Sequence, residues 1–237
     1  RGAVLMLQEG NLSRDDQAGA LQLMVNVASQ SSANGRAVHN AGGLGIATSL
    51  LHSGDDELVD KATELVQTLS SLPEAAKVVR EYGGVEVLVQ QLDDEDPSTR
   101  IHAMDSLKNM IGTDAQNCVA AANGGLVDAC LRFLRSRDSR DNSLKSRAAQ
   151  CLCKIMQHPS VRERELKRGS VGTITTELLT LLQSSESGRD AAAALAGLCG
   201  ADQGRTIAAA LSSKQLAEAA PKLLLAADDR DPVAASN

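Results

Sequence analysis

The sequence has almost no aromatic residues. It contains no tryptophan, and Tyr82 and Phe133 are its only tyrosine and phenylalanine. Because 43% of the 237 residues are hydrophobic, the chain can form a large core, but aliphatic side chains must fill it. Aliphatic cores suit close-packed helices better than sheets, which favour aromatic and β-branched residues. With only five prolines to interrupt helices, the composition predicts an all-α protein.

An excess of basic charge and a long hydrophobic run are also missing. The 24 Lys and Arg residues face 30 Asp and Glu residues, which gives a formal net charge of −6. Nucleic-acid-binding domains are usually basic, so we expect no nucleic-acid partner. The most apolar stretch, residues 191–201, is far shorter than the roughly 20 residues of a membrane-spanning helix. We therefore expect no membrane span.

The cysteines do not form an obvious disulfide framework. Their number is odd, and they lie in apolar segments at Cys118, Cys130, Cys151, Cys153 and Cys199. Buried free thiols in a reducing compartment explain this pattern better than disulfides do. We expect an intracellular, cytoplasmic protein, with nucleus and cilium left open. No secretory signal is visible, and the sequence starts beside an apolar segment, so we expect a fragment of a larger chain.

No group of residues has the pattern of a catalytic or metal site. The four histidines are 13 to 56 residues apart, without an HxE or HExxH pattern, and no GxSxG occurs. Cys151 and Cys153 are two positions apart, which separates them by about 200° around a helix. We expect no enzyme activity, no metal and no cofactor.

Pairs of adjacent glycines recur at a fixed interval. They stand at 42–43, 83–84 and 124–125, which is a step of 41 residues each time. A weaker copy, Gly169-Ser170, follows 45 residues later. A period of 40–47 residues is the signature of a helical solenoid. The glycines lack the preceding strand and the GxGxxG pattern of a phosphate-binding loop, so we interpret them as tight turns between helices that require positive φ or close packing.

Each period contains the same three segments. A short helix precedes the glycines, an apolar helix follows them, and a longer helix comes after an acidic or Ser-rich turn. In one long helix, Ile101, Met104, Leu107 and Ile111 recur at three- and four-residue steps and form an apolar stripe. We predict a single domain over residues 1–237, with full repeats at 31–72, 73–113, 114–157 and 158–201 and partial repeats at 1–30 and 202–237.

The glycine pair, the unit of about 42 residues and the "A-x-x-x-L-x-N" ending of the third helix resemble the armadillo-repeat family. The resemblance covers essentially the whole chain. It implies a right-handed α-solenoid whose third helices line a concave groove. It also implies a protein-interaction scaffold, in which an Asn near the end of each third helix holds the main chain of an extended peptide.

The resemblance places the groove residues by register. The Asn position corresponds to Asn26, Thr68, Asn109, Lys154 and Gly197. One helical turn earlier, importin-like members carry Trp, whereas this chain has Gln22, Glu64, Asp105, Gln150 and Ala193. A nuclear-import receptor is therefore not expected. The acidic residues of this row suggest that a bound peptide has basic residues.

A basic segment offers an alternative way to bind a partner. It comprises Arg132, Arg135, Arg137, Arg140, Lys145 and Arg147. Such a run is usually a solvated surface, but it is also a candidate docking patch for an acidic partner. In that case the chain would be a structural subunit of a large assembly, for example cytoskeletal or ciliary. A nucleotide-exchange factor for a chaperone is a third interpretation, supported by the repeats alone.

Overall fold

The computed structural model describes residues 2–8, 12–138, 141–181, 191 and 195. Within these residues the regular structure is helical, and no strand is present. The chain divides into two compact units, residues 1–125 and 126–237, which are described separately below. The repeat expected at 202–237 and most of residues 182–201 lie outside the described residues. The prediction of a single domain remains a prediction.

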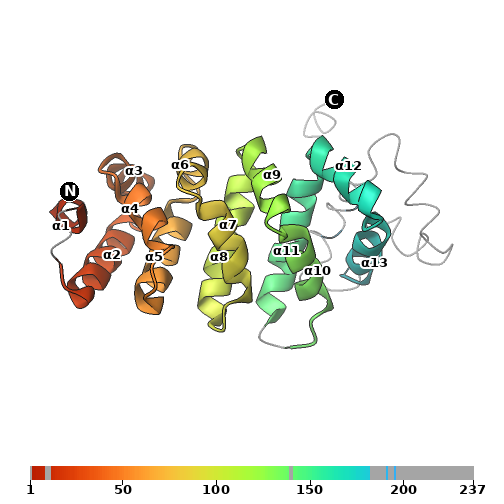
Figure 1. Cartoon of the computed structure of the whole chain (residues 1–237), viewed down its shortest axis with the longest axis horizontal. Coiled ribbons are helices and arrows are strands. Elements are labelled where there is room, and N and C mark those ends of the chain that lie inside the picture. Colours follow the sequence, from red (N-terminus) through yellow and green to blue (C-terminus); the bar gives the residue numbers. More distant parts are fainter. Residues whose placement is uncertain (1, 9–11, 139–140, 182–190, 192–194, 196–237) are drawn as a thin grey trace, which may run out of the picture. The chain divides into compact units, whose positions relative to one another are not determined.

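The first unit contains nine α-helices among its described residues (Figure 1). They are α1 (Gly2–Gln8), α2 (Arg14–Ala28), α3 (Ser32–Asn40), α4 (Gly43–Leu50), α5 (Asp56–Leu69), α6 (Ala75–Glu81), α7 (Gly84–Gln90), α8 (Pro97–Ile111) and α9 (Ala115–Asn123). The short 3₁₀ helix η1 (Gln91–Asp93) continues α7. The predicted succession of a short, an apolar and a long helix is therefore confirmed as α3–α4–α5 and as α6–α7–α8.

Polar side chains cap the long helices at their first turns. Asp55 accepts a hydrogen bond from the backbone N–H of Leu58 at the start of α5, and Asp96 accepts one from Thr99 at the start of α8. Pro97 occupies the first turn of α8, where a missing N–H costs nothing. These caps explain why the acidic turns of the sequence mark helix starts.

The glycine pairs form the predicted tight turns. Gly42 and Gly83 have φ values of +94° and +69°, in the left-handed region that glycine adopts easily. The second glycine of the pair has a different role: a Cβ on Gly84 would lie 2.5 Å from Thr48 Cγ2 and 2.8 Å from Val79 Cγ1. The third pair is shifted by one residue, since there the second glycine, Gly125, has φ +98°.

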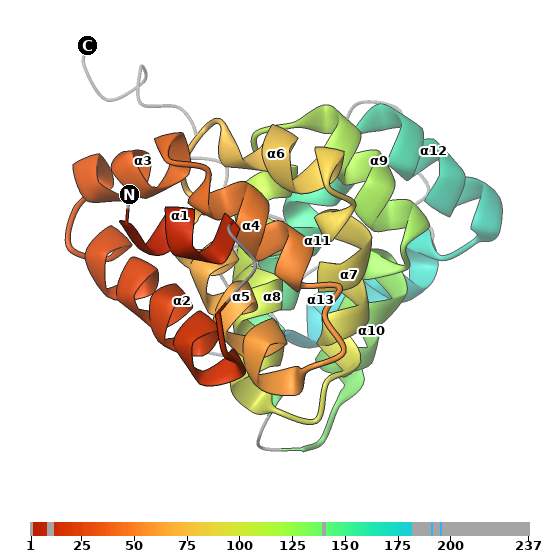
Figure 2. The same ribbon diagram turned by 60° about the vertical axis from the view of Figure 1, so that its left-hand side comes forward.

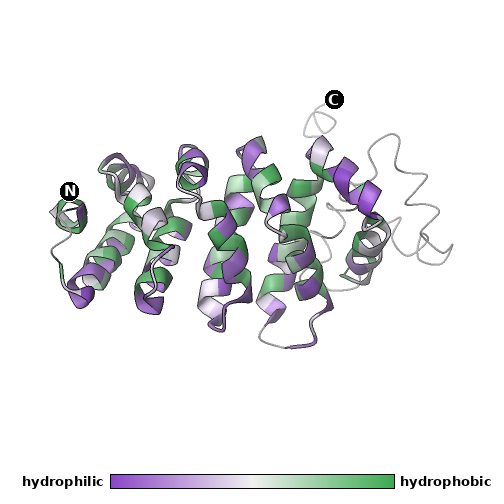
Figure 3. Ribbon diagram, viewed as in Figure 1, coloured by the Kyte–Doolittle hydropathy of each residue, from purple (hydrophilic) through white to green (hydrophobic). Residues whose placement is uncertain are grey.

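The long helices of the first unit pack side by side. Helix α2 contacts α5, and α5 contacts α8, and Figure 2 shows these three helices below α3, α4 and α6. Leu65 of α5 and Met104 and Leu107 of α8 are fully buried. Hydrophobic and hydrophilic residues alternate along these helices, and the turns at which they begin are hydrophilic (Figure 3). The row of long helices is therefore one layer of the unit.

The described part of the second unit contains α10 (Leu126–Arg135), α11 (Asn142–Met156), α12 (Pro159–Arg168) and α13 (Val171–Leu181). Helix α10 packs against α11 and α13. The turn between α12 and α13 is held by Glu165, which is fully buried and accepts hydrogen bonds from Arg164, Arg168 and Ser170. Gly169 ends α12 with φ +72°, as the weaker fourth copy of the glycine pair predicts.

Candidate functional site

Three of the predicted peptide-binding positions lie in one row on the long helices of the first unit. Asn26, Thr68 and Asn109 come from α2, α5 and α8, which pack consecutively. Asn26 is exposed, and Thr68 and Asn109 are partly exposed. Gln22, Glu64 and Asp105 stand one turn earlier on the same helices and are also partly exposed. We call these six residues the third-helix row.

The carboxamide of Asn109 connects two repeats. Its Nδ2 donates a hydrogen bond of 2.9 Å to the Ser70 hydroxyl, which follows the end of α5. A carboxamide has two N–H donors and an acceptor oxygen. In the described part of the chain, the second N–H and Oδ1 of Asn109 have no hydrogen-bond partner. Asn109 is thus held in place by one bond and keeps both a donor and an acceptor for a ligand.

Asn26 is also held by a neighbouring side chain of the row. Gln22 donates from Nε2 to Oδ1 of Asn26 at 3.2 Å, and its own Oε1 accepts a 2.6 Å hydrogen bond from Lys61 Nζ on α5. Thr68 donates its hydroxyl proton to the Glu64 carbonyl oxygen at 2.8 Å. Its hydroxyl can therefore only accept a further hydrogen bond, whereas Asn26 retains its amide N–H groups.

The acidic residues of the row have lysine partners that the sequence interpretation missed. Lys61 Nζ lies 3.7 Å from a Glu64 carboxylate oxygen, and Lys108 Nζ lies 2.8 Å from Asp105 Oδ1. Each pair is three residues apart, a spacing at which side chains of one helix face each other, so the signal was present in the sequence. The pairs reduce the negative potential that the two acids alone would give this surface.

The remaining predicted positions lie in the second unit or outside the described residues. Gln150 and Lys154 are partly exposed on α11, and Gln150 Nε2 lies 3.5 Å from the Ser146 hydroxyl. Gly197 and Ala193 lie outside the described residues. The structure therefore brings together six of the eight proposed peptide-binding residues and places the other two on one helix of the second unit.

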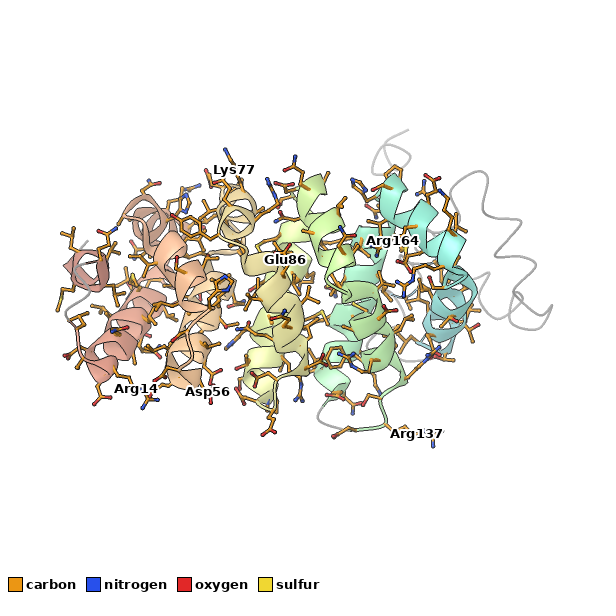
Figure 4. The ribbon with its side chains drawn as sticks, viewed as in Figure 1. Arg14, Asp56, Lys77, Glu86, Arg137 and Arg164 are labelled. Carbon is orange, nitrogen blue, oxygen red and sulfur yellow. The ribbon has the colours of Figure 1, made fainter. Side chains whose placement is uncertain are left out.

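Several basic residues of the candidate docking patch have partners within the chain. Arg135 forms a 2.7 Å ion pair with Glu177, and Arg147 donates to the Ser143 carbonyl at 2.7 Å. The Arg132 guanidinium lies 5.8 Å from the centre of the Phe133 ring. Arg137 is exposed in the segment after α10 (Figure 4), Lys145 is partly exposed, and Arg140 lies outside the described residues. Several of these basic side chains therefore already interact with other groups of the same chain.

The described residues show neither a metal-binding cluster nor a membrane span. They contain no group of three or more His, Cys, Asp or Glu side chains able to hold a metal ion. Among the helices that the structure describes, none is both long and apolar enough to cross a membrane. Cys118, Cys130 and Cys151 are buried free thiols, as predicted, whereas Cys153 is partly exposed and Cys199 lies outside the described residues. Burial raises the pKa of the Cys130 thiol well above its ordinary value, because the buried site disfavours the thiolate.

The family model described as the plant U-box protein ARM repeat region matches residues 5–225. The chain belongs to this family. A search of curated proteins found no match. The armadillo family that the sequence motifs indicated is therefore confirmed over nearly the whole chain, and the fold is an all-α solenoid of armadillo repeats.

Solved structures of engineered proteins, several of them designed armadillo repeat proteins, are similar to this chain. An engineered protein is 24% identical, with a TM-score of 0.71, and the match covers 96% of this chain and 97% of that one. Computationally designed armadillo repeat proteins for modular peptide recognition match at 17% identity and TM-score 0.76, over 95% and 98% of the two chains. A designed armadillo repeat protein in complex with the peptide (KR)4 matches at 17% identity and TM-score 0.71, and the match covers 100% of this chain and 94% of that one. At these identities the likeness establishes the fold.

Proposed function

We propose that this armadillo domain is a non-enzymatic scaffold that binds an extended segment of a partner protein along the third-helix row. The observation that carries the proposal is the arrangement of Asn26, Thr68 and Asn109 at one register on three consecutively packed helices. Packed helices lie about 10 Å apart, close to the length of three extended residues. One peptide can therefore meet all three positions.

The hydrogen-bonding groups of the row suit a peptide main chain. Asn109 offers an N–H and an oxygen to the same ligand, Asn26 offers amide N–H groups, and Thr68 offers an acceptor oxygen. The internal bonds to Ser70 and Gln22 fix the two carboxamides before a ligand arrives. A side chain that is already ordered loses less entropy on binding. This combination supports recognition of an extended chain rather than of a small molecule.

The charges of the row favour a polar peptide with a weak preference for basic residues. Glu64 and Asp105 supply negative charge, but Lys61 and Lys108 stand beside them, so the four groups together are neutral. A designed relative is complexed with the peptide (KR)4, which makes that peptide a suitable probe. We propose that this chain binds it weakly and binds mixed polar sequences better.

A test begins with the selection of peptides on the protein from a randomised display library. The affinity of a selected peptide is then measured by calorimetry for three proteins: wild type, Asn26→Ala/Asn109→Ala and Arg132→Glu/Arg137→Glu. The proposal expects the first double variant to weaken binding and the second to leave it within twofold. If only the charge reversals abolish binding, the third-helix row is unused. The basic patch, and with it the structural-subunit alternative, then takes its place.

A further inference from the structure

A hollow of about 620 Å³ lies among the shorter helices of the first unit. Its described walls come from α1, α3, α4 and α6, which lie in the upper part of Figure 2, whereas the third-helix row lies on α2, α5 and α8. Helices both before and after α3 and α4 border the hollow, so it is not an uncovered end of the unit. Its size is within the range of ligand-binding sites. The lining includes Ile46, Leu50, Val78, His39, Glu81 and Tyr82.

The aromatic wall of the hollow depends on a glycine. A Cβ on Gly45 would lie 3.3 Å from the Tyr82 hydroxyl oxygen and 3.4 Å from its Cζ, so the ring lies directly against the backbone of α4. The side chain is nevertheless 51% exposed. Counted from the glycine of positive φ, Glu86 takes the place of Gly45 in the next repeat, and Gly124 takes that of Tyr82. The arrangement of ring on glycine therefore belongs to this junction and is not repeated at the next.

A bridge between short helices is also particular to the next junction. There Arg80 connects α6 to α9 through a 3.2 Å ion pair with Asp114. Counted in the same way, His39 takes the place of Arg80 one repeat earlier, and Leu72 takes that of Asp114. Leucine cannot accept a hydrogen bond, and His39 Nδ1 is buried without a partner among the described residues. The hollow is therefore bordered by an imidazole whose hydrogen-bonding capacity the described fold does not use.

The charge of the hollow is negative. Among the described lining residues, Glu81 is the charged one. Its carboxylate lies 3.6 Å from Lys77 Nζ, and both side chains are exposed. An exposed ion pair of this kind contributes little to stability. The carboxylate can therefore exchange Lys77 for a cation that is held more favourably inside the hollow.

We propose that this hollow binds an arginine side chain of a partner protein, flanked in the partner by aliphatic residues. The guanidinium pairs with the Glu81 carboxylate and stacks on the exposed part of the Tyr82 ring, and the aliphatic neighbours cover Ile46 and Val78. Arginine fits better than lysine because its planar fork matches a carboxylate, stacks on aromatic rings and is more weakly hydrated than an ammonium group. The site is separate from the third-helix row and does not depend on the proposed function.

Tyr82 is a direct reporter of this site, because it is the only tyrosine of the chain. In protein labelled with ¹³C at tyrosine, the ring signals come from this residue alone. The peptide acetyl-Leu-Arg-Leu-amide is titrated into the full chain, and we expect a saturable shift of these signals. Citrulline in place of arginine keeps the shape but removes the charge, and should weaken binding at least about tenfold. A lysine peptide should bind with intermediate affinity.

Two variants locate the arginine. Glu81→Gln should weaken binding at least about tenfold, whereas the control Glu86→Gln, an exposed acid on α7 (Figure 4), should leave it within about twofold. Gly45→Glu copies the residue of the next repeat, displaces the Tyr82 ring and should abolish binding. Equal binding of the arginine peptide and either substituted peptide would overturn the proposal. So would unchanged binding by Glu81→Gln, or binding detected by calorimetry without a shift of the Tyr82 signals, since the peptide would then lie elsewhere.

Discussion

The Asn109 side-chain amide and the Ser70 hydroxyl form a 2.9 Å hydrogen bond between consecutive armadillo repeats. The bond links α8 to the residue that follows α5, and it orients the carboxamide whose remaining donor and acceptor are open to a ligand. Replacing Asn109 therefore has two effects, one on packing between repeats and one on ligand binding. Substitutions at the two residues separate these effects.

Asn109→Ala is expected to weaken binding of a selected peptide by about 1–2 kcal/mol, because two hydrogen bonds to the peptide main chain are lost. Ser70→Ala is the matched control, since it removes the internal bond and leaves the carboxamide in place. It should change affinity by less than threefold. Titration calorimetry of both variants checks the difference. Equal losses in the two variants would assign Asn109 a structural role alone.

Charge substitutions in the row should change its preference for basic ligands in opposite directions. Lys61→Ala/Lys108→Ala leaves Glu64 and Asp105 without their lysine partners and is expected to strengthen binding of (KR)4 by about tenfold at low salt. Glu64→Ala/Asp105→Ala leaves the lysines and should abolish binding of this peptide. Both effects should shrink as the salt concentration rises. If the two variants bind (KR)4 equally, the peptide lies elsewhere.

The order of short, apolar and long helices and the glycine turns were predictable because each depends on residues close together in sequence. A left-handed turn requires glycine, and the fixed period reveals it. The pairing of Lys108 with Asp105 also follows from helix spacing, although the acid alone was interpreted as ligand-binding. The bond from Asn109 to Ser70 was not predictable, because it depends on how far apart two repeats pack. The shift of positive φ to Gly125 likewise depends on where α10 begins.

Gly84→Ala is expected to destabilise the protein by about 1–3 kcal/mol. The added Cβ would lie 2.5 Å from Thr48 Cγ2 and 3.2 Å from the Val79 carbonyl oxygen, so both neighbours must move. Gly172→Ala on α13 is the control, because among the described residues a Cβ there would meet no atom within 4 Å beyond its chain neighbours and its own helix backbone. It should be neutral or slightly stabilising, since alanine favours helix. Urea unfolding measures both, and an equal change would refute the close-packing role of Gly84.

The Asp114 carboxylate should make stability depend on acidic pH. Burial acts to raise its pKa, but the Gln116 backbone N–H and the Arg80 guanidinium, 3.2 Å away, outweigh burial and lower the pKa below its ordinary value of 3.8. A lowered pKa in the folded state stabilises the protein above the unfolded-state pKa, and this stabilisation is lost as the pH falls below about 4.

The variant Asp114→Asn tests this dependence, because asparagine can still cap α9 but does not titrate. It should be less stable than wild type at pH 7, and the difference should narrow toward pH 3. Unfolding midpoints measured across this range provide the comparison. A constant difference between the two proteins would show that the ionisation of Asp114 contributes nothing.

Site-specific photocrosslinking tests most directly whether the third-helix row binds an extended chain. A benzophenone side chain is placed at Thr68, in the centre of the row, or at Lys77, which is exposed on α6 in the same unit (Figure 4). A selected peptide is then irradiated with each protein, and the crosslinked products are identified by mass spectrometry. We expect the peptide to crosslink from position 68 and not from position 77. Crosslinks from position 77 alone would contradict peptide binding along the row.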